Sequence, residues 1–275
     1  MLIKKELNDN LKAKFNPDGS NLRKYQLFLL DILIKFDEIC KQNSIEYWLS
    51  SGTLLGAVRH GEFIPWDDDI DVELLDEDYE KLKIIFQENH FDDFVFQTHD
   101  TDPGYIAPYG KFKTLKLNIT EHANADVNYK YKGAYLDVFR MGRRSLICSK
   151  LSTKIINNLY DLSHTIVEES QKKEHLKKID RRYNFIYKKV FPIFKFIDKI
   201  FTSKDTLRHD YGSRFYHLRR KSDIFPLKEI SFEGKMFPCP NNCDAYLRKI
   251  YKNYEEIPQI NDIKIHLSVP DMQNL

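Results

Sequence analysis

The segment "WDDDIDVEL", residues 66–74, holds four aspartates, and from Asp69 onward acidic and apolar residues alternate. Successive side chains of a strand point to opposite faces, so the alternation predicts a strand with Asp67, Asp69 and Asp71 on one face. The intervening apolar residues predict that the other face is buried. Carboxylates two residues apart on a strand lie about 6–7 Å apart and repel each other unless a cation binds between them. The fold of this chain therefore has to accommodate concentrated negative charge.

An EF-hand calcium loop is one alternative, because Asp67, Asp69 and Asp71 match the first, third and fifth positions of that loop. The sixth position of an EF-hand requires glycine for a sharp turn, and here it is Val72. The strand is therefore favoured, and a divalent cation held by Asp69 and Asp71 explains their spacing most simply. The remaining alternative is an acidic strand edge that faces water.

The composition of the 275-residue chain is typical of a globular protein, with 42% hydrophobic residues and a net charge of +2. This balance predicts no nucleic-acid partner. Residues 1–15 carry scattered charges and lack the apolar core of a secretory signal, and no apolar run reaches the ~18 residues that cross a bilayer. The four cysteines fit neither a disulfide framework nor a zinc site, so we expect reduced thiols and a cytoplasmic location.

Helical and strand patterns alternate through the first half of the chain. Apolar residues recur every three or four positions over residues 21–43 and 76–89, which predicts two amphipathic helices, the first capped by Ser20 or Asn21. Residues 45–49, 94–98, 109–119 and 133–141 are predicted strands. We therefore predict an α/β (α+β) fold, with a mixed sheet core flanked by helices and a mostly helical C-terminal portion.

Three parts are expected along the chain: an α/β core at 1–148, a basic helical region at 149–230, and a C-terminal hairpin and helix at 231–275 that packs back on the core. The helical pattern of the middle part continues to about Lys221, with a break at Pro192. The hairpin is predicted to turn at Glu233–Gly234, and the helix to be capped by Asn241 or Asn242.

The basic helical region concentrates positive charge. Residues 181–221 hold twelve Lys and Arg against three Asp. Aromatic residues are interleaved with these lysines, as expected for a surface that lies against an anionic membrane or holds an anionic lipid-linked glycan. The alternative is a helical pair whose aromatic residues pack inward while the lysines face water.

Phosphoryl or nucleotidyl transfer needs further groups beside a carboxylate pair. Asp137 is an acid within the otherwise apolar strand "AYLDVF" and is the candidate third carboxylate. Gly52 lets the backbone approach a phosphate, to which the Thr53 hydroxyl and the first amides of the following helix can donate. The candidate phosphate-binding cations, each of which is otherwise an ordinary exposed residue, are Arg59, Lys111 and Lys113.

Three segments resemble the LicD family of phosphotransferases, which includes the fukutin-type enzymes: "YWLSSGTLLGAVRHGEFIPWDDDIDV", "YLDVF" and "FEGKMFPCPNNCDAYLRKIYKNY". The resemblance runs from about Leu22 to Tyr254 and is weaker in the helical segment. It implies a nucleotidyltransferase core like that of the DNA polymerase beta superfamily. It also implies that Asp69 and Asp71 are the metal pair, Asp137 the third acid, and Gly52–Thr53 the phosphate-binding turn.

The resemblance also implies an activity: transfer of a phospho-alcohol, typically phosphocholine from CDP-choline, to a hydroxyl of a cell-surface glycan such as lipopolysaccharide, capsule or teichoic acid, with CMP as product. Mg²⁺ or Mn²⁺ is the expected cofactor. The expected partners are a CDP-activated donor and a glycan or lipid-linked glycan acceptor, met at the inner face of the plasma membrane. The alternatives are ribitol, glycerol or ethanolamine phosphate as the group transferred, an NTP-using nucleotidyltransferase, and a catalytically silent glycan-binding protein.

The chain departs from the family pattern after Asp137. Where the family commonly continues "DIFP", this chain has "DVFRM". Arg140 is therefore either a contact for a phosphate or acidic sugar, or an ion-paired residue, and the ion pair is favoured.

Overall fold

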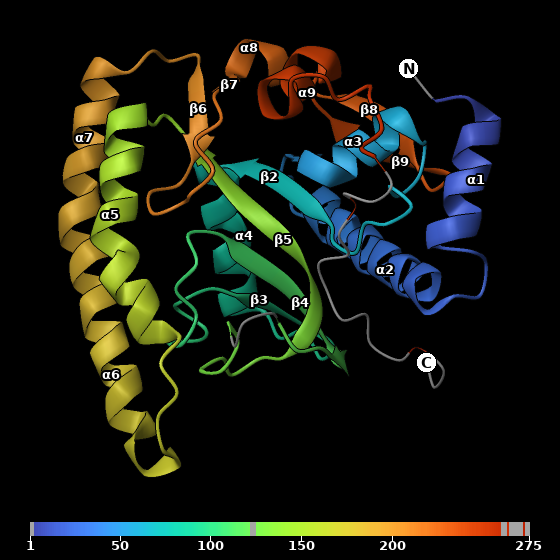
Figure 1. Ribbon diagram of the computed structural model, residues 1–275. Coiled ribbons are helices and arrows are strands. Elements are labelled where there is room, and N and C mark those ends of the chain that lie inside the picture. Colours follow the sequence, from blue (N-terminus) through green and yellow to red (C-terminus); the bar gives the residue numbers. More distant parts are fainter. Residues whose placement is uncertain (1–2, 122–124, 260–262, 264–271, 273–275) are drawn as a thin grey trace. The chain divides into compact units, whose positions relative to one another are not determined.

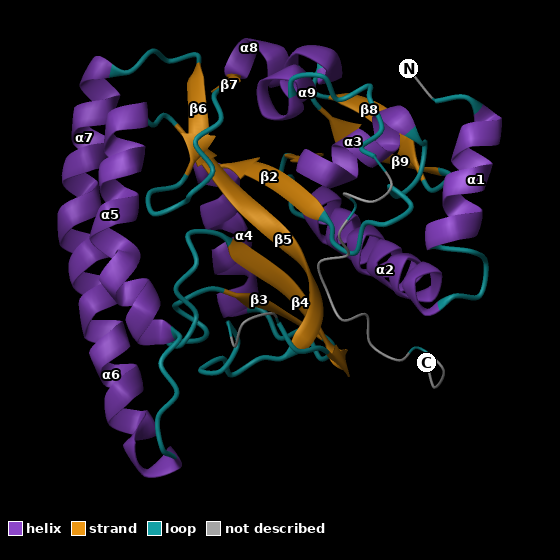
Figure 2. Ribbon diagram, viewed as in Figure 1, coloured by secondary structure: helices purple, strands orange, loops and turns teal. Residues whose placement is uncertain are grey.

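The computed structural model describes residues 3–121, 125–259, 263 and 272. Helices and strands interleave along the chain, and the predicted α/β fold with a mixed sheet and flanking helices is confirmed (Figure 2). The chain forms two compact units, and each is assembled from separate stretches of sequence. Unit 1 contains residues 1–74, 135–137 and 222–275, and unit 2 contains residues 75–134 and 138–221.

Unit 1 holds the N-terminal helices and the C-terminal hairpin (Figure 1). Apart from one end residue each of β2 and α8, it contains α1 (Lys5–Phe15), α2 (Asn21–Gln42), β1 (Tyr47–Leu49), α3 (Ser51–Arg59), β2 (Asp71–Leu75), α8 (Lys221–Ile224), β8 (Lys228–Phe232), β9 (Lys235–Cys239) and α9 (Cys243–Tyr251). The helix α2 starts as predicted, because the Ser20 side chain accepts a hydrogen bond from the backbone N–H of Arg23 at 3.2 Å.

The C-terminal part of unit 1 contacts its N-terminal part. The hairpin β8–β9 turns at Glu233 and Gly234, as predicted, and both residues have positive φ angles. Asn242 caps α9, also as predicted, by accepting a hydrogen bond from the backbone N–H of Ala245. The strand β9 contacts β1, and α9 contacts α3. These contacts place the start of α3 beside the C-terminal helix.

Unit 2 is built from one long helical region and several strands (Figure 1). It contains α4 (Asp76–Glu88), β3 (Phe94–Gln97), β4 (Gly110–Asn118), both ends of β5 (Gly133–Gly142), α5 (Leu146–Ser163), α6 (Glu169–Phe185), the π-helical turn η2 (Ile186–Val190), α7 (Phe191–Phe201), β6 (Thr206–His209) and β7 (Arg219–Arg220). The strand pairs β3–β4, β5–β6 and β6–β7 are antiparallel. The three middle residues of β5 belong to unit 1.

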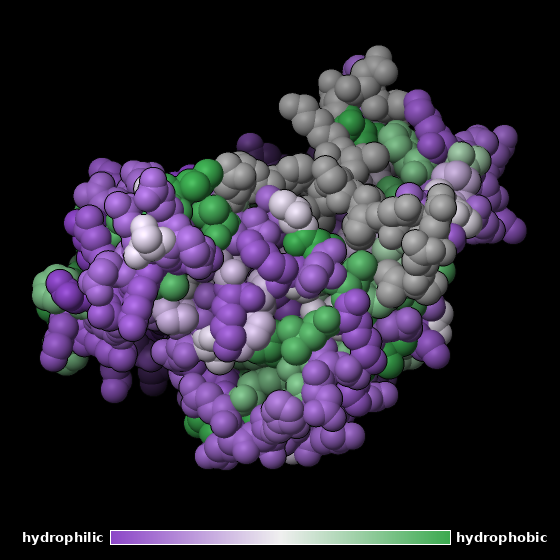
Figure 3. All heavy atoms as spheres, turned by 90° about the horizontal axis from the view of Figure 1, so that it is seen from below, coloured by the Kyte–Doolittle hydropathy of each residue, from purple (hydrophilic) through white to green (hydrophobic). Residues whose placement is uncertain are grey.

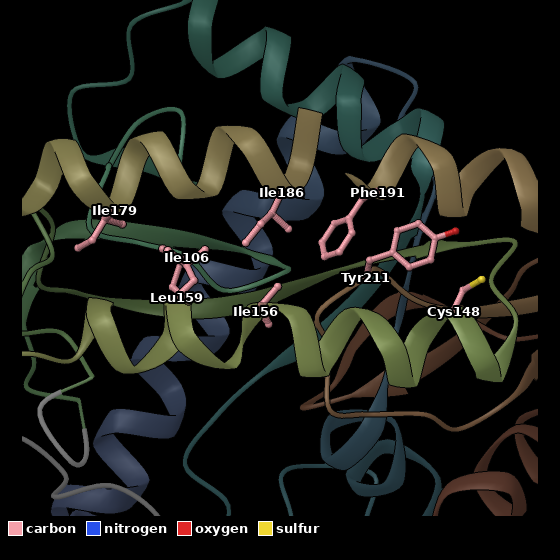
Figure 4. Packing of buried hydrophobic residues seen from close by; sticks show 8 residues of the cluster. All are labelled: Ile106, Cys148, Ile156, Leu159, Ile179, Ile186, Phe191 and Tyr211. Carbon is pink, nitrogen blue, oxygen red and sulfur yellow. The ribbon is translucent and has the colours of Figure 1, made fainter. Parts of the chain in front are cut away.

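The helices of unit 2 enclose an apolar cluster. In Figure 4 the side chains of Ile186 and Phe191 point toward Ile156 and Leu159 of α5. The other members of the cluster are Ile106, Cys148, Ile179 and Tyr211. The faces of α5 and α7 that point into this cluster are therefore fixed by burial of apolar surface.

The predicted break at Pro192 is wrong, because the chain is helical from Glu169 to Phe201. The turn η2 directly precedes the proline, and the backbone N–H of Phe191 donates to Ile186 O, five residues earlier. This wider turn makes room for the proline ring, which has no N–H to donate. The helical run ends earlier than predicted, and residues 202–220 form β6, β7 and loops in which Gly212 has a φ of +93°.

The buried Arg144 and the partly exposed Arg140 organise the polar part of unit 2. Arg144 donates to Asp76 at 3.0 and 3.1 Å and to Asp210 at 2.9 Å. Arg140 donates to Asp76 at 2.6 Å and also pairs with Glu80. The favoured prediction of an ion-paired Arg140 is confirmed. Burial by itself lowers the pKa of both guanidinium groups, but the charges of Asp210 and Asp76 outweigh it and raise both pKa values above the usual one, so both arginines stay charged.

Arg144→Met is expected to lower the free energy of unfolding by about 3 kcal/mol, because it removes the buried cation that Asp76 and Asp210 share. Arg140 is then left to balance both acids. Urea denaturation followed by circular dichroism measures this loss. The matched control is Arg220→Met, since Arg220 is exposed in the same unit. Equal stability of the two variants would contradict a structural role for Arg144.

The described part of the chain contains no helix that is both long and apolar enough to cross a bilayer. Hydrophilic side chains dominate the face drawn in Figure 3, and apolar side chains appear between them in small groups. The four cysteines are thiols, as predicted, and form no disulfide.

Candidate active site

The acidic segment lies in unit 1, between α3 and β2. The strand begins at Asp71, later than predicted, and residues 67–70 form an extended approach to it. The predicted alternation of burial nevertheless extends through the approach: Asp67, Asp69 and Asp71 are partly exposed, whereas the residues between them are buried. The side chains therefore alternate over a longer stretch than the hydrogen-bonded strand.

Three carboxylates of this segment converge. One oxygen from each of Asp67, Asp68 and Asp69 lies within 4.8 Å of the others. Asp68 is only 1% exposed, so its carboxylate belongs to the interior of unit 1. The sequence assigned no definite role to Asp67 and Asp68, although the run of three aspartates was the available signal.

Asp71 and Asp137 are held next to this group by backbone and hydroxyl contacts. The backbone N–H of Asp71 donates to Thr53 Oγ1 at 2.9 Å, and the Ser51 side chain hydrogen-bonds to the Asp71 carboxylate. The backbone N–H of Asp137, on β5, donates to Ile70 O at 2.8 Å. The three predicted acids, Asp69, Asp71 and Asp137, thus come from two adjacent segments of unit 1.

The charges of these acids act on one another. Burial, followed by the charges of Asp69 and Asp137, raises the pKa of Asp71 well above its ordinary value of 3.8. Burial and the charges of Asp69 and Asp68 raise the pKa of Asp67 in the same way, against the effect of Arg59. Protonation or a bound cation would relieve this repulsion. Carboxylate oxygens are the ligands that Mg²⁺ prefers, so the donor set fits such an ion.

The Asp67 carboxylate lies against Gly52, at the beginning of α3. A Cβ atom at this position would lie 2.7 Å from Asp67 Oδ2, which is closer than such contacts permit. Any larger residue at position 52 would therefore displace the Asp67 carboxylate, whereas the sequence suggested that the glycine admits a phosphate. The first N–H groups of α3 have no partner within the helix, so they can donate to an anion near Thr53.

Arg59 lies at the other end of α3 and is almost fully buried. Its guanidinium donates to His60 Nε2 at 3.0 Å and to the carbonyl oxygens of Tyr254 and Glu256 at 3.0 and 3.2 Å. Burial lowers the pKa of Arg59 to about 10. Burial and the Arg59 charge lower the pKa of His60 to about 3, so this imidazole is neutral and accepts from Arg59. Arg59 thus fixes the segment after α9, and contact with a phosphate stays a prediction.

Lys111 and Lys113 are on β4 of unit 2 and are buried rather than exposed. Each ammonium group donates a hydrogen bond of 3.0 Å to a carboxylate oxygen of Glu121, so one acid pairs with both lysines. Glu121 was not identified as this partner from the sequence, because no local pattern shows that the chain after β4 folds back so that residue 121 contacts the strand. A role of the two lysines in phosphate binding stays a prediction.

An α/β fold that gathers several carboxylates beside the N-terminus of a helix is typical of enzymes that transfer phosphoryl or nucleotidyl groups. The chain matches the family model described as "LicD/FKTN/FKRP, nucleotidyltransferase domain" over residues 44–140 and 133–242. Because these matches cover most of its length, the chain belongs to the LicD family and is a phosphotransferase enzyme of that type. The resemblance found in the sequence is confirmed.

Individual relatives cover different shares of the chain. A Haemophilus influenzae protein named lipopolysaccharide cholinephosphotransferase LicD is 28% identical over 272 residues, covering 89% of this chain and 95% of the relative. The human protein named ribitol 5-phosphate transferase FKRP is 56% identical over 34 residues, which are 12% of this chain and 7% of that protein. Mannosyltransferase regulator 4 of Saccharomyces cerevisiae is 25% identical over 170 residues, covering 60% of this chain and 13% of the relative.

Proposed function

We propose that this enzyme transfers phosphocholine from CDP-choline to a hydroxyl group of a cell-surface glycan and releases CMP. The carboxylate cluster at the start of α3 is the observation that carries the proposal, since a diphosphate donor needs a cation between itself and these acids. The choice of choline is supported by the Haemophilus influenzae relative, of which 95% is covered.

The carboxylates are proposed to have distinct roles. Asp69 and Asp71, with Asp67 and Asp68, would hold Mg²⁺ or Mn²⁺. When bound, such an ion supplies charge neutralisation at the diphosphate. The first N–H groups of α3 and the Thr53 hydroxyl would orient the donor phosphates.

The reaction itself is an in-line displacement at phosphorus. The acceptor oxygen forms a bond to the phosphorus that bears choline, the bond from this phosphorus to the CMP oxygen breaks, and the hydroxyl proton passes to a carboxylate. We propose Asp137 as this base, because it comes from β5 rather than from the 67–71 segment whose acids would hold the cation, and its position is fixed by the contact of its backbone with Ile70.

Ribitol phosphate is the second candidate for the transferred group, because a 34-residue stretch is 56% identical to ribitol 5-phosphate transferase FKRP. Incubation with CDP-choline, CDP-ribitol, CDP-glycerol or CDP-ethanolamine, with and without Mg²⁺, distinguishes the donors by release of CMP. CTP is included because an NTP-using nucleotidyltransferase releases pyrophosphate instead. Release of CMP from CDP-ribitol but not from CDP-choline would overturn the proposed donor.

Asp137→Asn is expected to lower kcat by about 10³-fold, since an amide cannot accept the acceptor proton. The affinity for Mg²⁺, measured by calorimetry, is expected to change far less than kcat if Asp137 is the base rather than a metal ligand. A variant that loses Mg²⁺ binding together with activity would show that Asp137 is a ligand.

A further inference from the structure

The helix α7 presents an unusual number of apolar side chains to solvent. Phe201 is 81% exposed, Phe196 is 65% exposed and Ile193 is 58% exposed. With Ile197 and Ile200, these residues recur at intervals of three, four, seven and eight positions, so they form one stripe along the helix. We call these five residues the α7 stripe.

The α7 stripe is separate from the face of α7 that holds the helix in place. Phe191 and Asp198 are buried, and Phe191 points into the apolar cluster shown in Figure 4. The Asp198 carboxylate accepts hydrogen bonds from the Ser145 N–H and from the Tyr211 hydroxyl, both at 2.9 Å. Packing of unit 2 therefore does not explain why the α7 stripe is apolar.

The neighbouring helix α5 has a similar outer face. It lies beside α6 and α7 in Figure 1, and it contacts both. Ile147 of α5 is 72% exposed, and Leu151 and Ile155 are exposed as well. Exposed apolar residues on two helices that contact each other are typical of a site that binds another surface.

The charges around the α7 stripe are positive. The exposed cations of α5, η2 and α7 are Lys150, Lys154, Lys188, Lys189, Lys195 and Lys199. Residues 146–163 contain one acid, the exposed Asp161 near the end of α5, and the one acid of residues 185–201 is the buried Asp198. The six lysines thus outnumber the one exposed acid of these helices, and one of the six, Lys195, lies near an acid of another element, Asp76, at 3.8 Å.

We propose that the α7 stripe and the adjoining face of α5 dock unit 2 on an anionic lipid surface, with α7 lying in the plane of the interface. Apolar side chains of such a helix enter the boundary between headgroups and acyl chains, and each lysine near the surface gains energy from anionic lipids. The sequence suggested the whole segment 181–221 as the membrane-facing part. The surface proposed from the structure takes only α7 and the lysines of η2 from that segment and adds the outer face of α5.

A second copy of the chain is the main rival as an occupant. In a two-fold symmetric dimer the same patch of each copy faces the other, so the lysines of both copies would approach each other. Like charges brought together in this way oppose association, whereas anionic lipid headgroups complement them. The charge of the surface therefore favours the lipid.

Vesicle sedimentation tests the docking directly. The full chain is expected to bind vesicles that contain phosphatidylglycerol and to bind pure phosphatidylcholine vesicles at least about tenfold more weakly. Phe196→Ser combined with Ile200→Ser is expected to lower binding to the anionic vesicles by at least about tenfold. The matched control is Ile84→Ser with Leu115→Ser, which changes two exposed apolar residues elsewhere in unit 2 and is expected to bind like wild type.

Lysine variants test the electrostatic part. Lys189→Gln with Lys199→Gln is expected to lower binding by about 20-fold at low ionic strength and much less at high salt. Lys173→Gln with Lys178→Gln, both exposed on α6, is the control and is expected to change binding by less than about twofold. Equal binding of both lysine variants would overturn the electrostatic part of the proposal.

A spectroscopic probe reports whether α7 itself enters the lipid. The emission of a Phe196→Trp variant is expected to shift to shorter wavelength when anionic vesicles are added, whereas an Ile84→Trp variant should show no shift. The proposal would be overturned in favour of a second copy by three results together. The wild-type protein would not bind vesicles and would sediment as a dimer, and the variant with Phe196→Ser and Ile200→Ser would sediment as a monomer.

Discussion

Asp71→Asn is expected to reduce phosphotransfer by about 10³-fold, because it removes one acid of the cluster that would hold the cation against the donor phosphates. The amide keeps the size of the side chain, and the backbone N–H of residue 71 can still donate to Thr53 Oγ1. The loss is therefore chemical rather than structural. Release of CMP measures it.

The same substitution is expected to stabilise the metal-free protein. The raised pKa of Asp71 means that above pH 3.8 the folded chain keeps a proton that the unfolded chain has released. The stability that this carboxyl group contributes therefore falls as the pH rises from 3.8 to the raised pKa of the folded protein. An asparagine carries no charge to repel Asp69 and Asp137, so the midpoint of thermal unfolding without metal should rise at neutral pH.

The matched control is Asp31→Asn, since Asp31 is exposed on α2 in the same unit. This control is expected to leave both activity and unfolding temperature unchanged. If Asp71→Asn kept wild-type activity, the Asp71 carboxylate would not be needed for transfer. If the substitution lowered the stability of the metal-free protein, repulsion among the acids would not destabilise the fold.

Local sequence patterns predicted most elements of the fold, because their causes are local. The cap of α2 at Ser20 and the turn of the β8–β9 hairpin depend on residues within three positions. The helix through Pro192 was missed, since a π-helical turn depends on packing against α5 and leaves no signal in composition. The division into two units assembled from separated stretches depends on contacts distant in sequence.

The candidate site shows the same limit. Alternation in "WDDDIDVEL" correctly separated the partly exposed Asp67, Asp69 and Asp71 from the buried residues, although the strand itself begins only at Asp71. The pairing of Lys111 and Lys113 with Glu121 was not predicted, because a basic residue looks the same in sequence whether its partner is a phosphate or a carboxylate. The spacing of a motif therefore predicts which acids share a face of a strand, but it does not predict which group a lysine will pair with.

Removal of divalent cations is expected to abolish activity, and the apparent affinity for Mg²⁺ is expected to increase with pH. Protonated Asp67 and Asp71 cannot act as ligands, so binding must displace protons from groups whose pKa values are raised. For each proton displaced, the apparent association constant rises about tenfold per pH unit until the raised pKa is passed. Isothermal titration with Mg²⁺ between about pH 5 and pH 8 measures this slope.

Thermal unfolding gives a readout that does not depend on catalysis. Because Mg²⁺ would bind the folded acid cluster and not the unfolded chain, a concentration about 100 times the dissociation constant should add about 2.7 kcal/mol of stability. This gain should disappear in Asp71→Asn and persist in Asp31→Asn. An Mg²⁺ affinity that is flat with pH would contradict the raised pKa values of Asp67 and Asp71, and a wild-type unfolding temperature that Mg²⁺ does not change would contradict a metal-binding role of the acids.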